Sequence, residues 1–261
     1  MKRRLITLFS ILIILTLYLV WQNNDLVTTH YEVDASQAPT ETIKVIHLSD
    51  LHSKTFANNQ NRLVSNVLDL DPDLIVLTGD MIDDDVDSIS DHLEFLEVLS
   101  EEVPVYSVSG NHEYWSEKLD ELKTVYESLG VNFLEDESTD ITINETSVTL
   151  YGASDLAKYS NKAAYLDSIP GATEEGLSIL LAHRPAHFTE YADLGYDLVL
   201  SGHAHGGMFR VPFIGGLYSP DQGFFPKYTS GPYKKEGTTL IVSRGLGNSV
   251  IPFRIMNRPE I

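Results

Sequence analysis

The stretch Asp197-Leu198-Val199-Leu200-Ser201-Gly202-His203-Ala204-His205-Gly206-Gly207 joins an apolar run to a polar, glycine-rich turn. The apolar run predicts a buried strand, and the glycines let the backbone turn tightly after it. Two histidines separated by one residue at a strand end can direct both rings at one point, and imidazole is the commonest side-chain metal ligand. For the motif alone a surface turn is the more common explanation, so its meaning depends on the rest of the chain.

Short apolar runs alternate with helical patterns from residue 42 onward. The runs predict strands at 43–48, 74–77, 104–108, 131–134, 141–143, 148–151, 177–182, 197–200 and 238–242. Apolar residues at helical spacing predict helices at 61–70, 88–101 and 116–129. Alternating strands and helices followed by a strand-rich half predict a layered α/β sandwich.

A polar cluster follows each of several predicted strands. The clusters are Ser49-Asp50-Leu51-His52, Thr78-Gly79-Asp80, Ser109-Gly110-Asn111-His112-Glu113, Ala182-His183-Arg184 and Ser201 to His205. Each cluster alone has an ordinary reading as a helix cap, a turn or a core histidine. Their joint occurrence favours one site, because ligand sites of α/β sheets form at the carboxyl ends of the strands.

The clusters supply oxygen and imidazole donors and no sulfur. The seven candidate metal ligands are Asp50, His52, Asp80, Asn111, His183, His203 and His205. This donor set suits two divalent ions better than a structural zinc. One carboxylate must then bridge the two ions, and Asp80 on the central loop is the expected bridge.

Composition excludes several other functions. The chain has 261 residues and a formal net charge of −20, which argues against nucleic-acid binding through basic patches. It has no cysteine, which excludes a thiol nucleophile, disulfides and cysteine-ligated clusters.

The N-terminus predicts a membrane anchor. Lys2-Arg3-Arg4 precedes Leu5 to Trp21, an uncharged stretch that spans about 25 Å as a helix. A cleaved signal peptide is the alternative, but no small-x-small cleavage pattern lies just after Trp21, and Ser36-Gln37-Ala38, which fits it, lies too far downstream. An uncleaved anchor over 1–21 would keep the basic residues in the cytoplasm and place the rest of the chain outside the cell membrane. Residues 22–41 are then expected to form a tether and 42–261 the folded domain.

The five linked clusters make the chain resemble the calcineurin-like metallophosphoesterases. That family's pattern of Asp-x-His, Gly-Asp, Gly-Asn-His-Asp/Glu, a single His and Gly-His-x-His occurs here in order, from Asp50 to His205. The resemblance implies a four-layer α/β/β/α sandwich. It also implies that a first metal takes Asp50, His52, Asp80 and His205, and that a second takes Asp80, Asn111, His183 and His203.

The same resemblance implies how such a site acts. Two divalent ions activate a bridging water that attacks phosphorus; Mn²⁺ is expected, with Fe, Zn, Mg or Ni as alternatives. His112 aligns with the family's catalytic histidine and Asp83 with a carboxylate that orients it. Arg184 or Arg244 could pair with a phosphate oxygen, although either fits an ordinary surface cation equally well.

Ser243-Arg244-Gly245-Leu246-Gly247 and Pro259-Glu260 are similar to the membrane-associated branch that cleaves UDP-2,3-diacylglucosamine, although Ala204 and Met208 depart from that branch. We therefore expect a monomeric phosphodiesterase or pyrophosphatase that acts on a lipid-linked or cell-envelope substrate. A phosphomonoesterase or protein phosphatase is the first alternative. A non-catalytic scaffold is the second, and it is disfavoured because no ligand of the pattern is missing.

Overall fold

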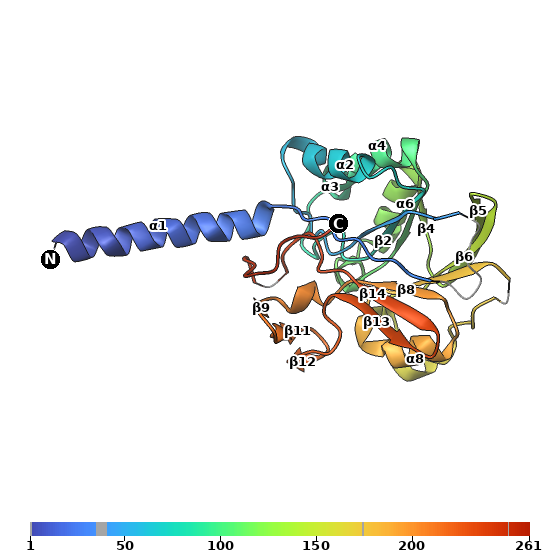
Figure 1. The fold of residues 1–261 in the computed structure, drawn as a ribbon. Coiled ribbons are helices and arrows are strands. Elements are labelled where there is room, and N and C mark those ends of the chain that lie inside the picture. Colours follow the sequence, from blue (N-terminus) through green and yellow to red (C-terminus); the bar gives the residue numbers. More distant parts are fainter. Residues whose placement is uncertain (1, 35–40, 174, 250) are drawn as a thin grey trace.

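The computed structural model describes residues 2–34, 41–173, 175–249 and 251–261. Two stacked sheets carry helices on their outer faces, and a long N-terminal helix projects away from this domain (Figure 1). The predicted α/β/β/α sandwich is therefore confirmed.

The first sheet is entirely parallel, in the order β1-β2-β3-β4. Its strands are β1 (Val45–Leu48), β2 (Leu74–Thr78), β3 (Val105–Val108) and β4 (Val131–Phe133). The helices α2 (Asn61–Leu68), α3 (Ile89–Leu93), α4 (Phe95–Glu102) and α6 (Leu119–Ser128) connect these strands. Because the strands run in parallel, the loops that follow β1, β2 and β3 meet at one edge of the sheet.

The second sheet has the order β13-β14-β8-β7-β6-β5. Its parallel centre contains β6 (Thr146–Gly152), β7 (Leu177–Leu181), β8 (Leu198–Ser201) and β14 (Thr238–Val242). The edge strands β5 (Glu137–Ile143) and β13 (Gly231–Lys235) pair antiparallel. The helices α7 (Lys162–Leu166) and α8 (Phe188–Asp193) cover its outer face.

Short elements complete the chain. A helix α5 (Asn111–Trp115) follows β3, and two small hairpins are formed by β9 (Arg210–Val211) with β10 (Gly215–Gly216) and by β11 (Tyr218–Ser219) with β12 (Gly223–Phe224). Single 3₁₀ turns are η1 (Asn58–Gln60), η2 (Leu156–Lys158), η3 (Pro185–His187) and η4 (His205–Gly207).

Alternation along the buried strands separates three apolar layers. In β2, Ile75 and Leu77 pack against the helices, whereas Leu74 and Val76 face the second sheet. In β8, Leu198 and Leu200 face the first sheet, and Val199 packs toward α8. Each fully buried side chain of this size contributes about 1.5–3 kcal/mol, so the layers hold the strand ends in fixed positions.

Three predicted elements differ from the observed ones by more than two residues or are divided. The helix expected over 88–101 is two helices, α3 and α4, that meet at Glu94, and Ser88 caps the first by accepting the amide of Asp91. The helix expected over 116–129 begins at Leu119 as α6, and α5 precedes it. The strand expected over 141–143 begins at Glu137, because β5 lies at a half-exposed edge where polar residues obscure an apolar pattern.

Helix α1 (Lys2–Asn24) is long and apolar enough to cross a bilayer, a test that a signal sequence also passes. The chain after it is hydrogen-bonded to the C-terminus: Val27 N donates to Pro259 O at 2.9 Å, and Ile261 N donates to Val27 O at 2.9 Å. The expected tether therefore begins against the domain, and its residues 35–40 lie outside the described residues.

Candidate metal centre

The two sheets bring the predicted ligands together at their facing edges. β1, β2 and β3 lead to Asp50, Asp80 and Asn111, and the loops after β7 and β8 supply three histidines, His183, His203 and His205. The ligand atoms of His52, Asp80 and His112 lie within 4.8 Å of one another, and two further groups with this spacing consist of predicted ligands alone. They are Asp50, His52 and His205, and Asp80, His183 and His203.

The first set is tight and buried. His52 Nε2 lies 3.2 Å from His205 Nε2, and His205 Nε2 lies 3.5 Å from Asp50 Oδ1. The side chains of His52, His205 and Asp50 are 0%, 5% and 0% exposed. Two imidazole nitrogens at this distance with carboxylate oxygens around them can hold one divalent cation between them.

The second set adjoins the first through Asp80. Asp80 Oδ2 lies 3.2 Å from His183 Nε2 and 3.8 Å from His52 Nε2, so one carboxylate faces both sets. His203 Nδ1 lies 3.1 Å from His183 Nε2. Asn111 Oδ1 is buried without a hydrogen-bond partner, and such an orphaned acceptor calls for a ligand. These donors therefore fit two cations with Asp80 shared between them.

The backbone at the site is strained. Five of the predicted ligands have a positive φ: Asp50 (51°), His52 (48°), Asp80 (52°), His203 (61°) and His205 (46°). A non-glycine residue in this region costs of order 1–3 kcal/mol and persists only where the surrounding structure enforces it. Such strain gathers at functional sites, and here it turns the side chains of neighbouring loops toward one another.

Two glycines of the motifs are required by close approach. A Cβ on Gly202 would lie 2.4 Å from Asp50 Oδ2, and one on Gly79 would lie 2.3 Å from the amide nitrogen of Gly110. Gly79 also has a φ of +86°, which favours glycine. The glycines therefore allow the ligand loops of different strands to touch.

The buried carboxylate of Glu113 holds the loops after β2 and β3 together. It accepts the amides of Asp80 at 2.8 Å, Met81 at 2.7 Å and Gly110 at 2.7 Å. Burial, together with the nearby charge of Asp80, raises the pKa of Glu113 to about 7, against the opposing effect of these amides. The sequence pattern includes Glu113, but no role is evident until the loop around Asp80 is folded.

Asp80 and His183 form a charge pair. Burial disfavours the ionised carboxylate, but the hydrogen bond and the positive charge of His183 outweigh it and hold the pKa of Asp80 well below its usual range. Burial likewise opposes protonation of His183, but the Asp80 charge and hydrogen bond raise the pKa of His183 to about 10. His183 Nδ1 lies 2.7 Å from Thr78 O, which leaves Nε2 directed at Asp80.

His112 lies beside the first donor set. Its ring meets that of His52 edge to face at 4.5 Å between centroids, and its Nδ1 lies 3.6 Å from Asp83 Oδ1 and 3.5 Å from Asp84 Oδ1. Asp83 Oδ1 is closer to His52, at 2.8 Å from Nδ1. A carboxylate in this position orients a ligand histidine and raises its basicity, so the geometry couples Asp83 to His52 more strongly than to His112.

The two candidate phosphate-binding arginines are engaged elsewhere. Arg184 is buried and donates to Asp155 through Nε at 2.7 Å and NH2 at 2.9 Å, and it also pairs with Asp221. Arg244 pairs with Glu260 at 2.9 Å. Both guanidinium groups therefore have carboxylate partners.

Asp221 was not predicted as a site residue. It lies in the turn between β11 and β12, its Oδ2 is 3.1 Å from His203 Nε2, and it bridges to Arg184. The imidazole of His203 beside it lowers the pKa of Asp221, with burial opposing this effect and Arg184 adding to it. Pro220-Asp221-Gln222-Gly223 reads as a turn, so the sequence holds no signal for this contact.

The chain belongs to the calcineurin-like phosphoesterase family, whose model matches residues 43–207. It is 29% identical over 223 residues to the uncharacterized metallophosphoesterase YkoQ of Bacillus subtilis, covering 84% of this chain and 82% of that protein. It is 30% identical over 226 residues to the phosphodiesterase YaeI of Escherichia coli, covering 84% and 80%. A Danio rerio transmembrane protein with a metallophosphoesterase domain is 30% identical over 233 residues, covering 84% of this chain and 52% of that protein.

Family membership and the paired donor sets agree. The chain is a metal-dependent phosphoesterase, and its clustered carboxylate and imidazole groups are the potential ligands for divalent metals.

Proposed function

We propose that the chain hydrolyses a phosphodiester or pyrophosphate whose other part is lipid-linked or belongs to the cell envelope. The observation that carries the hydrolytic site is the sharing of Asp80 between two buried donor sets. Divalent cations bound there, Mn²⁺ in our proposal, supply Lewis acidity to a phosphoryl group and to water. The similarity to a phosphodiesterase of Escherichia coli supports a diester substrate.

The protein's own groups hold the reacting parts in place. Asp50, His52, Asp80 and His205 would hold one cation, and Asp80, Asn111, His183 and His203 the other. His112 has a side chain 13% exposed at the edge of the first set, so its imidazolium can donate a proton to a departing oxygen. Asp83 fixes the ring of His52 through the contact at 2.8 Å, and its Oδ1 also lies 3.6 Å from His112 Nδ1.

Helix α1 supports the membrane part of the proposal. Its length and apolar composition suit a single-pass anchor, and relatives named as transmembrane proteins carry the same kind of domain. Lys2, Arg3 and Arg4 form the first turn of α1 and favour a cytoplasmic N-terminus, with the domain on the outer side. A monomer suffices, since one chain supplies both donor sets.

The full-length protein in detergent tests the proposal. It should hydrolyse bis(p-nitrophenyl) phosphate with Mn²⁺, lose this activity in EDTA and regain it when Mn²⁺ is restored. The monoester p-nitrophenyl phosphate should be a poorer substrate by kcat/KM. Activity that survives EDTA would contradict the metal site, and a preference for the monoester would favour a phosphomonoesterase.

A further inference from the structure

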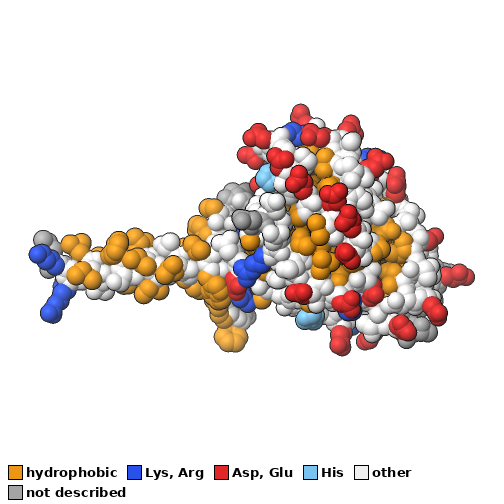
Figure 2. Space-filling view, turned by 90° about the horizontal axis from the view of Figure 1, so that it is seen from above, with side chains coloured by type: hydrophobic (Ala, Val, Ile, Leu, Met, Phe, Trp, Pro, Cys, Tyr) orange, Lys and Arg blue, Asp and Glu red, His pale blue; other side chains and the backbone are white. Residues whose placement is uncertain are grey.

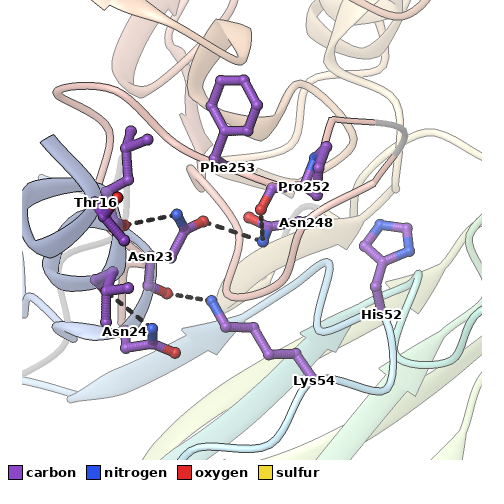
Figure 3. Close-up of a pocket in the computed structure, with 10 residues that line it drawn as sticks. Thr16, Asn23, Asn24, His52, Lys54, Asn248, Pro252 and Phe253 are labelled. Carbon is purple, nitrogen blue, oxygen red and sulfur yellow. Dashed lines mark hydrogen bonds between the residues drawn. The ribbon is translucent and has the colours of Figure 1, made fainter. Parts of the chain in front are cut away.

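A cavity of about 530 Å³ lies between α1 and the domain (Figure 3). The segment with Asn248, Pro252 and Phe253 faces α1 across it, and His52 and Lys54 line its inner end. The α1 residues that line it are Thr16, Leu19, Val20, Asn23 and Asn24. The cavity thus connects the apolar helix to a candidate ligand of the metal centre.

The end of α1 is fixed to the domain. Lys54 Nζ donates to Asn23 O, Arg62 Nη1 donates to Asn24 O at 3.0 Å, and Asn257 N donates to Gln22 Oε1 at 3.2 Å. Asp25 pairs with Arg62 at 2.8 Å. These contacts set the position of the cavity wall, so a flexible linker does not separate helix from site.

The cavity extends along α1 from its C-terminal end into the apolar part of the helix. Thr16 precedes Asn24 by two turns, which places it about 12 Å along the helix. Leu19 and Val20, between them, belong to the apolar stretch, and Phe253 lies opposite. If α1 crosses a bilayer, the outer end of the cavity therefore opens at the bilayer surface.

The domain beside α1 exposes large apolar side chains. Phe213, Ile214, Phe224 and Phe225 are 110%, 62%, 78% and 70% exposed. They belong to the β9–β12 hairpins, on the side of the domain from which α1 emerges (Figure 1). Stacking of Phe209 on Phe253 at 5.7 Å joins these hairpins to the cavity wall. We call the hairpins together with residues 251–256 the junction face.

Acidic side chains are distributed differently from the exposed apolar side chains of the junction face. Carboxylates lie mainly on the part of the domain away from α1, with apolar side chains between them, whereas few carboxylates lie along α1 and the apolar protrusion beside its inner end (Figure 2). Exposed apolar patches mark interaction sites. The continuity of this one with a helix suited to a bilayer identifies the lipid surface as its partner.

We propose that the junction face seats in the bilayer surface and that the cavity binds the head region of a phosphoester whose acyl part stays in the membrane. Leu19, Val20 and Phe253 would line the path of the apolar part. The amine of Lys54, which donates to Asn23 O and Leu246 O beside the cavity, would offer a further hydrogen-bond donor to the head region. This inference rests on the proposed function, because it delivers a phosphoester to the metal centre from the side of the membrane.

The seating of the junction face is tested with single cysteines, which the natural chain lacks. Phe213→Cys and Phe225→Cys are labelled with bimane in the full-length protein, reconstituted in nanodiscs that contain nitroxide-labelled lipid. Val98→Cys on α4, at a residue 47% exposed, is the control. We expect at least threefold stronger quenching at 213 and 225 than at 98. Equal quenching at all three positions would overturn the seating.

The path through the cavity is tested with one diester at two chain lengths. Dioleoyl phosphatidyl-p-nitrophenol in nanodiscs and its soluble dihexanoyl analogue release the same p-nitrophenolate. Leu19→Trp should fill the cavity and lower the ratio of long-chain to short-chain rates about tenfold. Leu17→Trp, on α1 but outside the cavity lining, should leave the ratio unchanged.

The outcomes separate this inference from the proposed function. If the unaltered protein hydrolyses neither diester, the phosphoesterase proposal is contradicted. Hydrolysis of the soluble diester with an unchanged ratio in Leu19→Trp would overturn the membrane path alone. An equal fall of the ratio in Leu17→Trp and Leu19→Trp would also overturn it, because the effect would not come from the cavity.

Discussion

The metal centre and the junction face both depart from the usual rule that apolar side chains are buried and charged ones exposed. The metal centre buries ionisable groups such as Asp80 and His183, whereas the junction face exposes Phe213 and Phe224. Either arrangement costs free energy in a protein alone in water. Each is therefore understandable through a partner outside the chain, a pair of cations in one case and a lipid surface in the other.

The two regions also differ in how they are held. Buried strands, glycine contacts and the carboxylate of Glu113 fix the ligand loops from all sides. The hairpins of the junction face contain strands of two residues each. Substitutions in the metal centre should therefore have large and specific effects on chemistry, and those near the junction should have smaller effects on stability.

The largest effect is expected for Asp80→Asn. The low pKa of Asp80 keeps it ionised, and the amide removes the negative charge that both donor sets share. The loss of kcat/KM should exceed the roughly 10²–10⁴-fold typical of losing a catalytic acid or base. Isothermal titration with Mn²⁺ should show weaker binding as well. The exposed Asp91→Asn on α3 is the control, and normal Mn²⁺ binding by Asp80→Asn would remove Asp80 from both sets.

His112→Ala should reduce turnover without loss of metal. The ring lies beside His52 but belongs to neither proposed ligand set, so we expect kcat to fall about 10²–10⁴-fold while Mn²⁺ affinity is kept. His92→Ala on α3 makes the same chemical change away from the site and should leave kcat unaltered. A parallel loss of metal from His112→Ala would make His112 a ligand.

Asp83→Asn should weaken metal binding about 10–100-fold, the usual cost of losing a carboxylate that orients a ligand histidine. Its hydrogen bond to His52 Nδ1 at 2.8 Å is the reason. Asp84→Asn is the matched variant, because Asp84 lies 3.5 Å from His112 Nδ1 and has a side chain 51% exposed. It should keep its metal affinity. If Asp83→Asn lowers kcat alone, its main role is toward His112, as the sequence resemblance implies.

The metal centre could be predicted from the sequence because its residues follow strands directly. Asp50, Asp80 and His203 each stand two residues after the end of β1, β2 or β8, and parallel strands bring such positions to one edge. Asp221 could not be found in this way. It reaches His203 from a hairpin far along the chain, and its contact exists only after the second sheet has formed.

The junction face could not be predicted from the sequence either. Phe224 and Phe225 look like core residues in the sequence, because an apolar residue in a glycine-rich segment carries no sign of its exposure. Nor does the sequence show that residues after α1 pair with the C-terminus at Pro259 and Ile261. Local patterns predict which residues follow a strand, but contacts between distant loops depend on how the layers close.

Lys54 lies where the two regions meet, and it gives the smallest expected effect. Burial, with Arg254 adding to it, lowers the pKa of Lys54 to about 7, against about 10.4 in the unfolded chain. The unfolded state therefore binds more protons between these values, and stability should rise as the pH increases from 7 to 10. Lys54→Met removes this contribution of about 2 kcal/mol, so its melting temperature should gain less than that of the unaltered protein between pH 7 and 9, by about 4–8 °C. Tryptophan fluorescence of the full-length proteins in detergent measures both slopes. If the melting temperatures of the two proteins rise equally with pH, the Lys54 amine stays charged in the folded state without loss of stability. Water would then reach this amine despite its contacts with Asn23 and Leu246.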